Sequence, residues 1–167
     1  MISDKMQCIV PIGDMRIGQT PDLLATDALG SCLCLTVYDS DTRVGGLLHA
    51  MLPLSKINTQ KAAINPFMFV DTGIPELFLT LSENGTAKDH WVVKAVGCGN
   101  PMGAKEVFKI GERNYRVLQE MLSKEGICLA AEDVGGTVTR KVVLDLANGQ
   151  TIVRINGTKK VLWKTQS

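Results

Sequence analysis

Cys32 and His49 are the two residues of this chain whose types and spacing allow nucleophilic chemistry. Cys32 lies in the largely apolar run 30–38, and His49 lies in the apolar run 44–52. A free thiol has a pKa of about 8.5 and is mostly protonated at neutral pH, but an imidazole beside it can accept the proton and create a nucleophile. The pair therefore predicts a cysteine–histidine hydrolase, if the fold places the two side chains together.

A β-hairpin would place them together. Both runs are rich in β-branched and apolar residues, and the polar segment 39–42 between them is typical of a turn. If the turn is centred between Ser40 and Asp41, Cys32 lies directly opposite His49, and opposite residues share a face with Cβ atoms about 4.5–5.5 Å apart. A slip of one residue would separate them, so the prediction depends on the register of the turn.

A third group usually orients the imidazole of such a pair, and Thr26, Asp27 and Ser31 are near enough in sequence to serve. Spacing alone does not choose among them. Taken from the residues alone, the commoner interpretation is that Cys32 is a small buried hydrophobe and His49 a hydrogen-bonded core histidine. An activated nucleophile would instead make Cys32 the cysteine that iodoacetamide alkylates fastest.

The motifs around these residues resemble a known family. Thr-Asp-Ala-Leu-Gly-Ser-Cys at 26–32, followed by His49 and by Met-Leu-Pro at 51–53, closely resembles the amino-terminal signature of CheD, the bacterial chemoreceptor glutamine deamidase family. Further similar segments follow in the family's order, at 70–75, 110–114, 131–136 and 140–142.

The resemblance implies a role for each residue of the signature. It assigns the nucleophile to Cys32, the general base and acid to His49, and the third catalytic residue to Thr26. The family's central glycine-rich segment corresponds to 97–102, where Cys98 and Pro101 depart from the usual pattern. These departures affect the expected loop shape and leave the catalytic trio intact.

The expected reaction is amide hydrolysis through a thioester on Cys32, with His49 moving the protons. Backbone N–H groups at Gly30, Ser31 and Cys32 are candidate donors to the oxyanion, because glycine permits close approach of the backbone. Thr26 is expected to accept the imidazole N–H and to fix its tautomer.

Composition agrees with a compact enzyme and excludes several other classes. A chain of 167 residues with 45% hydrophobic content can bury one core, so we expect a single domain over 1–167. A net charge of +1 and the absence of a basic run argue against nucleic acid. No signal peptide or apolar span of membrane length is present, which predicts a cytoplasmic protein without membrane insertion.

The five cysteines are scattered and odd in number, as is typical of a reducing compartment. Cys32 and Cys34 with His49 offer at most three metal ligands, and no fourth is evident, so no metal is expected. The sequence also lacks a phosphate-binding P-loop, and we expect no cofactor.

The expected architecture is α+β, with a mixed sheet and two main helices. Apolar spacing predicts helices over 71–84 and 112–125, buried strands over 91–96 and 127–131, and a hairpin of 141–146 with 151–155 around an Asn-Gly turn. The end of the chain, 158–167, is expected to be an edge strand or a mobile tail. The CheD resemblance implies a sandwich related to the catalytic domain of cytotoxic necrotizing factor.

Smaller motifs receive plainer interpretations. Residues 112–114 are expected to cap a helix with solvated charge, with a partner surface as the alternative. Residues 133–136 are expected to form a turn, with a place in the lining of the substrate cleft as the alternative. Residues 67–69 are either core or an exposed docking patch, His90 is expected at the surface without a companion, and Cys34 is expected to pack in the core.

Two functions from different classes follow. The first is deamidation of glutamines on the cytoplasmic helices of chemoreceptors, by a protein that is a monomer when free. The second is a docking regulator of chemoreceptors or of a CheC-type phosphatase that does not need turnover. The intact trio Thr26, Cys32 and His49 favours retained chemistry. A thiol hydrolase of small-molecule amides is a third, weaker possibility.

Overall fold

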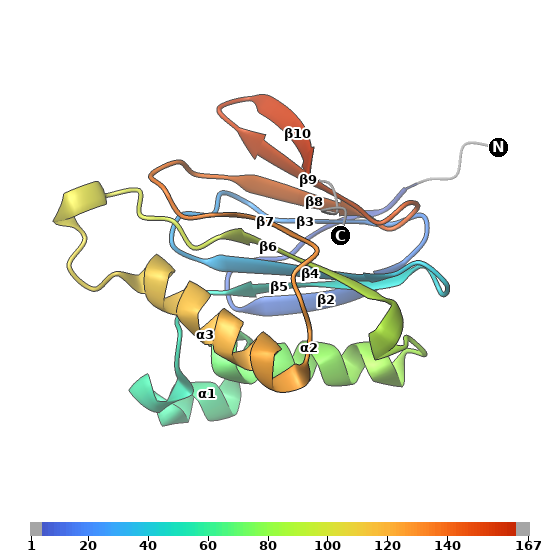
Figure 1. Ribbon diagram of the computed structural model, residues 1–167, viewed down its shortest axis with the longest axis horizontal. Helices are drawn as coiled ribbons and strands as arrows, with labels where there is room; N and C mark the ends of the chain where they lie inside the picture. The colour runs from blue at the N-terminus through green and yellow to red at the C-terminus, as the bar shows by residue number, and fades with distance from the viewer. Residues whose placement is uncertain (1–4, 163–167) are drawn as a thin grey trace.

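The computed structural model describes residues 5–162 and has three layers, formed by two stacked β-sheets and a layer of helices that covers the outer face of one sheet (Figure 1). Each sheet contains five strands, and no closed barrel is formed in the part described. The predicted α+β class with two main helices is confirmed. This layering gives the chain two separate apolar interiors, one between the sheets and one beneath the helices.

The described chain contains ten strands. The first sheet has the order β1-β3-β8-β9-β10, and its strands are β1 (Gln7–Ile9), β3 (Leu23–Ala25), β8 (Lys141–Asp145), β9 (Gln150–Ile155) and β10 (Thr158–Leu162). The second sheet has the order β2-β5-β4-β6-β7, and its strands are β2 (Asp14–Gln19), β5 (Val44–Ala50), β4 (Leu33–Asp39), β6 (Trp91–Gly97) and β7 (Ala131–Val134). The pairs β1/β3 and β6/β7 are parallel, and the other pairs are antiparallel.

Within residues 5–162, three α-helices and four short 3-10 turns are present. The α-helices are α1 (Thr59–Ile64), α2 (Val70–Glu83) and α3 (Ile110–Glu125), and the 3-10 turns are η1 (Ser55–Ile57), η2 (Pro66–Met68), η3 (Lys88–His90) and η4 (Gly103–Lys105). Both long helices agree with the prediction within two residues. Helix α3 ends where Gly126 adopts a left-handed conformation, with φ of 66°, which glycine tolerates without a steric penalty.

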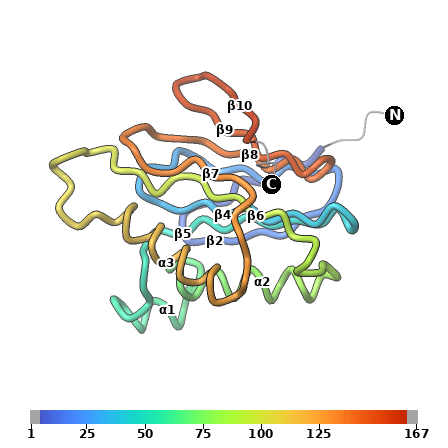
Figure 2. The backbone as a smooth tube through the Cα atoms, in the orientation of Figure 1, coloured from blue at the N-terminus to red at the C-terminus, as the bar shows by residue number. Residues whose placement is uncertain are grey.

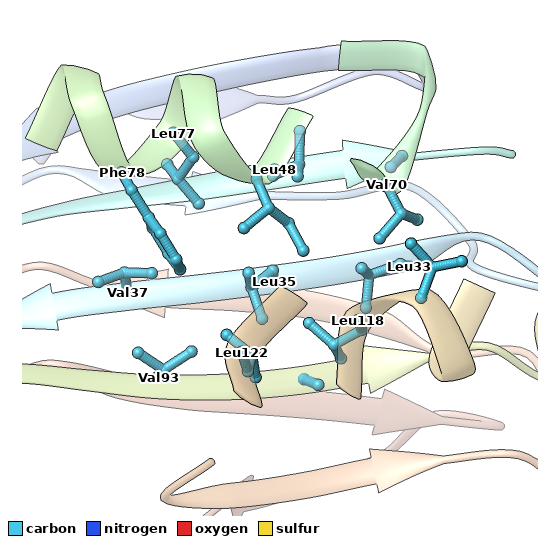
Figure 3. Close-up of a cluster of buried hydrophobic side chains, with 14 of the residues drawn as sticks. Leu33, Leu35, Val37, Leu48, Val70, Leu77, Phe78, Val93, Leu118 and Leu122 are labelled. Carbon is cyan, nitrogen blue, oxygen red and sulfur yellow. The ribbon is translucent and has the colours of Figure 1, made fainter. Parts of the chain in front are cut away.

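Strand β4 is buried on both faces because its side chains alternate between the two interiors. Leu33, Leu35 and Val37 point toward α2 and α3, where they pack in one cluster with Leu48 and Leu118 (Figure 3). The side chains between them point toward the first sheet: Cys34 and Tyr38 belong to the second cluster, as does Cys32 just before the strand.

The carboxyl-terminal third agrees with the prediction except at β7. Strands β8 and β9 form the expected antiparallel hairpin, and Thr158–Leu162 forms the edge strand β10, whereas residues 163–167 lie outside the described part. The strand predicted over 127–131 is wrong, because β7 begins only at Ala131. Figure 2 shows this segment climbing from the end of α3 back to the sheet, and Ile127 and Leu129 pack against the helix-side core before pairing with β6 begins.

Candidate active site

The register of the β4–β5 hairpin differs by two residues from the prediction. Cys34, and not Cys32, lies opposite His49, and the loop comprises residues 40–43. The Asp39 carboxylate accepts hydrogen bonds from the amides of the two loop residues Asp41 (2.8 Å) and Thr42 (3.3 Å), which stabilises this four-residue connection. Because a shift of two residues keeps each side chain on its face, Cys32 still shares a face with His49, as its diagonal neighbour.

His49 lies in the interior between the sheets, with 1% of its surface exposed. Its Nδ1 is 3.1 Å from the Val10 carbonyl, and because a carbonyl oxygen can only accept, Nδ1 carries the proton of the neutral ring. Burial lowers the pKa of His49, although this hydrogen bond and the Asp27 carboxylate partly offset the effect. Nε2 is therefore an unprotonated base at neutral pH, and it has no hydrogen-bond partner among the described residues.

Cys32 is more exposed than His49 and Thr26, with 8% of its surface accessible. Burial raises the pKa of its thiol above the ordinary value. Cys34 is fully buried and its thiol pKa is raised further by burial and by Cys98. The resting pair is therefore a neutral thiol and a neutral imidazole, and the thiolate forms only when a base takes the proton.

The backbone around the nucleophile is held through its carbonyl groups. The carbonyls of Gly30, Ser31 and Cys32 accept hydrogen bonds from Gly99 N (2.9 Å), Asn114 Nδ2 (3.0 Å) and Cys98 N (2.8 Å), respectively. These donors come from the loop that follows β6 and from α3, so two distant segments fix the conformation of 30–32.

The glycine-rich segment after β6 has a strained shape. Gly97 and Cys98 both have positive φ values, of 103° and 50°, and a side chain on Gly97 would lie 2.3 Å from the Cys32 carbonyl oxygen. Cys98 is therefore a non-glycine residue in a conformation that glycine favours. Its thiol is buried, and burial together with Cys32 raises its pKa to about 12.

Thr26 is buried near the site but is not the partner of the imidazole N–H, since the Val10 carbonyl occupies that position. The Thr26 hydroxyl instead accepts a 3.2 Å hydrogen bond from Val142 N, and the Thr26 amide donates to the Val142 carbonyl at 2.9 Å. Thr26 thus ties the segment before the nucleophile to β8. A backbone acceptor such as Val10 leaves no side-chain signal in the sequence.

A cavity of about 460 Å³ adjoins the nucleophile loop. Cys98 and Gly99 form part of its wall, and they are also the residues that hydrogen-bond Cys32 and Gly30. The other lining residues come from the β6–α3 loop, the first turns of α3, and the end of β7 with the turn that follows it: Asn100, Lys109, Gly111, Glu112, Tyr115, Val134, Gly135, Gly136 and Thr137. Its lining combines charged, polar and apolar side chains, among them Glu112, Asn100 and Val134.

Two of the smaller predictions need correction. His90 has a companion, because its Nδ1 lies 3.0 Å from the Asp41 carboxylate at the far end of β4. Asn114 is not a solvated capping residue but is completely buried at the site. Asn114 lies three and four residues before Val117 and Leu118, on the inward face of α3. This spacing in the sequence could have indicated that Asn114 is buried.

Two other features agree with expectation. Of the two alternatives for 67–69, the core is supported at Phe69, which is fully buried, and at Phe67, which packs against the helix-side core, whereas Met68 is half-buried. Gly135 and Gly136 form a turn with positive φ values, although Asp133 and Val134 belong to β7. Among residues 5–162, no helix combines the length and apolar character needed to cross a membrane.

Exposure changes the expected order of thiol alkylation. Cys128 is exposed, whereas Cys32 is nearly buried with a raised thiol pKa and Cys34 and Cys98 are buried. We expect iodoacetamide at pH 8 to label Cys128 first, Cys32 more slowly, and Cys34 and Cys98 last, as measured by peptide mass spectrometry over time. Labelling of Cys32 before Cys128 in the free protein would contradict a neutral resting pair.

The fold and these side chains define a class of α+β proteins with two stacked sheets, one of which is covered by helices. A cysteine and a histidine lie on the face of the helix-covered sheet that points toward the other sheet. Within that class, the family model described as "CheD chemotactic sensory transduction" matches residues 51–155. The chain belongs to the CheD family.

Curated relatives match nearly the full length of the chain. A protein of Solibacter usitatus (strain Ellin6076), named "Probable chemoreceptor glutamine deamidase CheD", is 43% identical over 157 residues, which cover 93% of each chain. A protein of Pyrococcus horikoshii with the same name is 38% identical over 157 residues, covering 93% of this chain and 96% of the relative. "Probable chemoreceptor glutamine deamidase CheD 1" of Syntrophus aciditrophicus is 38% identical over 150 residues, covering 89% and 94%.

Proposed function

We propose that this protein deamidates glutamine side chains on the cytoplasmic helices of chemoreceptors, with Cys32 as nucleophile and His49 as base and acid. The observation that carries the proposal is the unprotonated, unpartnered Nε2 of His49 on the same face as Cys32. The names of the relatives supply the substrate class. No cofactor or metal is needed for this chemistry.

The reaction begins with transfer of the Cys32 thiol proton to His49 Nε2 as the sulfur attacks the carboxamide carbon of glutamine. The tetrahedral intermediate collapses, the imidazolium gives its proton to the nitrogen, and ammonia leaves. His49 then takes a proton from water, which attacks the thioester; glutamate forms and the thiol is restored. Since Nε2 lacks a partner in the free protein, the thiol must approach it when substrate binds, as apo catalytic hydrogen bonds often tighten on binding.

The oxyanion of the intermediate is stabilised in this proposal by backbone amides of the nucleophile loop. The carbonyls of residues 30–32 are all engaged, and in that loop the amides at Ser31 and Cys32 are the donors nearest the sulfur. A Cβ on Gly30 would lie 2.9 Å from Pro101 Cγ, so glycine at this position lets the loop after β6 pack closely on the nucleophile loop. Thr26 is the third residue of the site and acts by holding the start of the loop to β8.

The test is peptide mass spectrometry of a chemoreceptor cytoplasmic fragment from the same organism after incubation with the protein. Conversion of glutamine to glutamate, with release of one ammonia per site, is the expected result. A fragment that binds the protein but remains unconverted would contradict the proposed chemistry.

A docking role receives independent support from the loop between β6 and α3. Met102, Val107 and Phe108 are 64%, 80% and 72% exposed on this loop, which projects from the end of the molecule where α3 begins (Figure 1). Exposed apolar side chains gathered on one loop are typical of protein-binding sites. In this second candidate function the loop contacts chemoreceptors or a CheC-type phosphatase.

The docking role predicts a loss of binding that is separable from chemistry. Phe108→Glu should weaken binding to the receptor fragment about 10-fold or more, because a charge replaces an exposed aromatic anchor. Binding is measured by titration calorimetry, with Ile64→Glu as the control, since Ile64 is 86% exposed on α1, outside this loop. Equal binding by both variants and the wild type would exclude the loop as a docking site.

A further inference from the structure

Asn114 is a completely buried amide that connects α3 to the segment before β4 and to the segment after β5. Its Nδ2 lies 3.0 Å from the Ser31 carbonyl oxygen and 3.0 Å from the Met51 carbonyl oxygen. Ser31 precedes the nucleophile, and Met51 follows His49 by two residues. Both N–H groups of one side chain are thus donated to the two segments that carry Cys32 and His49.

The orientation of the amide is fixed by these partners. Carbonyl oxygens only accept, so the nitrogen must face both of them, and Oδ1 must point away. Oδ1 is buried and has no hydrogen-bond partner among the described residues. A buried acceptor left without a partner is costly, so the two donated bonds decide the placement of this side chain.

The Ser31 carbonyl shares a peptide plane with the Cys32 N–H. The only cis peptide among the described residues is Thr20–Pro21, so the Ser31–Cys32 bond is trans and its N–H points opposite to its C=O. When Asn114 binds the Ser31 oxygen, it therefore also sets the direction of the Cys32 N–H. That N–H is the amide closest in the chain to the attacking sulfur.

The start of α3 packs closely on the loop after β6, which defines the direction of the Cys32 N–H. A Cβ on Gly111 would lie 2.1 Å from the Gly99 carbonyl oxygen and 2.6 Å from the Cys98 carbonyl carbon, so the helix packs directly on the backbone that hydrogen-bonds Cys32 and Gly30. Helix and loop hold the nucleophile segment from two sides.

We infer that Asn114 is a positioning residue that orients the Cys32 N–H as an oxyanion donor, an inference that rests on the proposed deamidase function. The Cys32 N–H then points at the developing oxyanion without reorganisation during the reaction. Removal of one oxyanion donor costs about 100- to 1,000-fold in kcat in a well-studied protease, and misdirection of a retained donor costs less.

The test compares two reactions of the same sulfur. Deamidation passes through an oxyanion, whereas alkylation by iodoacetamide does not. In Asn114→Ala we expect kcat for deamidation to fall about 10- to 100-fold with KM nearly unchanged, while the rate of Cys32 alkylation stays within about threefold of wild type. Asn114→Ser keeps one hydrogen-bond donor, so its kcat should lie between those of wild type and Asn114→Ala. It replaces the alanine variant in the test if that variant does not fold.

Thr86→Val is the matched control. Thr86 is buried and also makes two hydrogen bonds, to the Leu81 carbonyl and from Trp91 Nε1, both 2.8 Å, beyond the carboxyl end of α2. It should lower the thermal midpoint as Asn114→Ala does, with kcat unchanged.

Three outcomes would overturn the inference. Unchanged kcat in Asn114→Ala would show that the hydrogen bonds of Asn114 have no role in catalysis. A parallel loss of deamidation and alkylation would show that these hydrogen bonds only maintain the nucleophile loop. An equal loss of kcat in Thr86→Val would indicate a general effect of stability. If wild-type protein does not deamidate the fragment, the proposed function itself fails, a result distinct from these.

Discussion

Replacement of Cys32 by alanine is expected to reduce glutamine-to-glutamate conversion by at least about 1,000-fold while leaving the fold intact. Loss of the nucleophile in enzymes of this kind removes most of the rate enhancement, because no other group can form the covalent intermediate. The fold should persist, since the change removes one sulfur from a position just before β4 that retains 8% exposure. Conversion is measured by mass spectrometry of the receptor fragment.

The chain supplies a matched control two residues away. Cys34→Ala removes the same atom from the same strand face, opposite His49 in the ladder, but Cys34 is fully buried. We expect this variant to retain conversion within a few fold and to lose about 1–2 kcal/mol of unfolding free energy, because a small buried side chain is deleted. Abolished conversion in Cys34→Ala with retained conversion in Cys32→Ala would reverse the assignment of the nucleophile.

Elements with a strong local pattern could be predicted from the sequence. The apolar spacing of Ile74, Leu77 and Leu81 predicted α2, and the Asn-Gly turn predicted the β8–β9 hairpin, because each signal lies within a few residues of what it determines. Strand β7 was misplaced because its parallel partner, β6, is distant in sequence. Apolar residues show burial, but they do not show where pairing begins.

The geometry expected for the candidate site was only partly correct. Cys32 and His49 share a face as expected, yet the hairpin register was wrong because the turn is centred one residue later, where the Asp39 carboxylate accepts hydrogen bonds from the loop amides. The acceptor for His49 Nδ1 is a backbone carbonyl, which any residue at position 10 would provide. Sequence patterns report side chains well, and the missing parts of this site are contributed by backbone groups and by turn geometry.

Loss of the imidazole should be nearly as severe as loss of the thiol. His49→Asn retains an N–H that can bind the Val10 carbonyl in place of Nδ1 and removes the basic Nε2. General acid–base groups contribute about 100- to 10,000-fold, so conversion should fall by that range with only a small change in stability. Retention of more than about one tenth of wild-type activity would exclude His49 as the base.

The pH dependence tests the same residue in the unmodified protein. Because burial holds the pKa of His49 below its ordinary value of about 6.5, the acid limb of kcat/KM should have its midpoint below pH 6.5, where Nε2 becomes protonated in the folded protein. Since the Cys32 thiol pKa is raised, no loss of the neutral thiol is expected near pH 8.

The free energy of unfolding should also depend on the protonation of His49. Below about pH 6.5 the unfolded chain binds a proton at His49 that the folded protein resists, so the free energy of unfolding decreases as the pH falls from there toward the lowered pKa. His49→Asn lacks this site, and its stability should depend less on pH across that interval than that of wild type, as measured by urea unfolding at several pH values. An acid limb of kcat/KM centred above pH 6.5 would show that His49 is not the buried neutral base of this site. The same conclusion would follow if the stabilities of wild type and His49→Asn depended identically on pH.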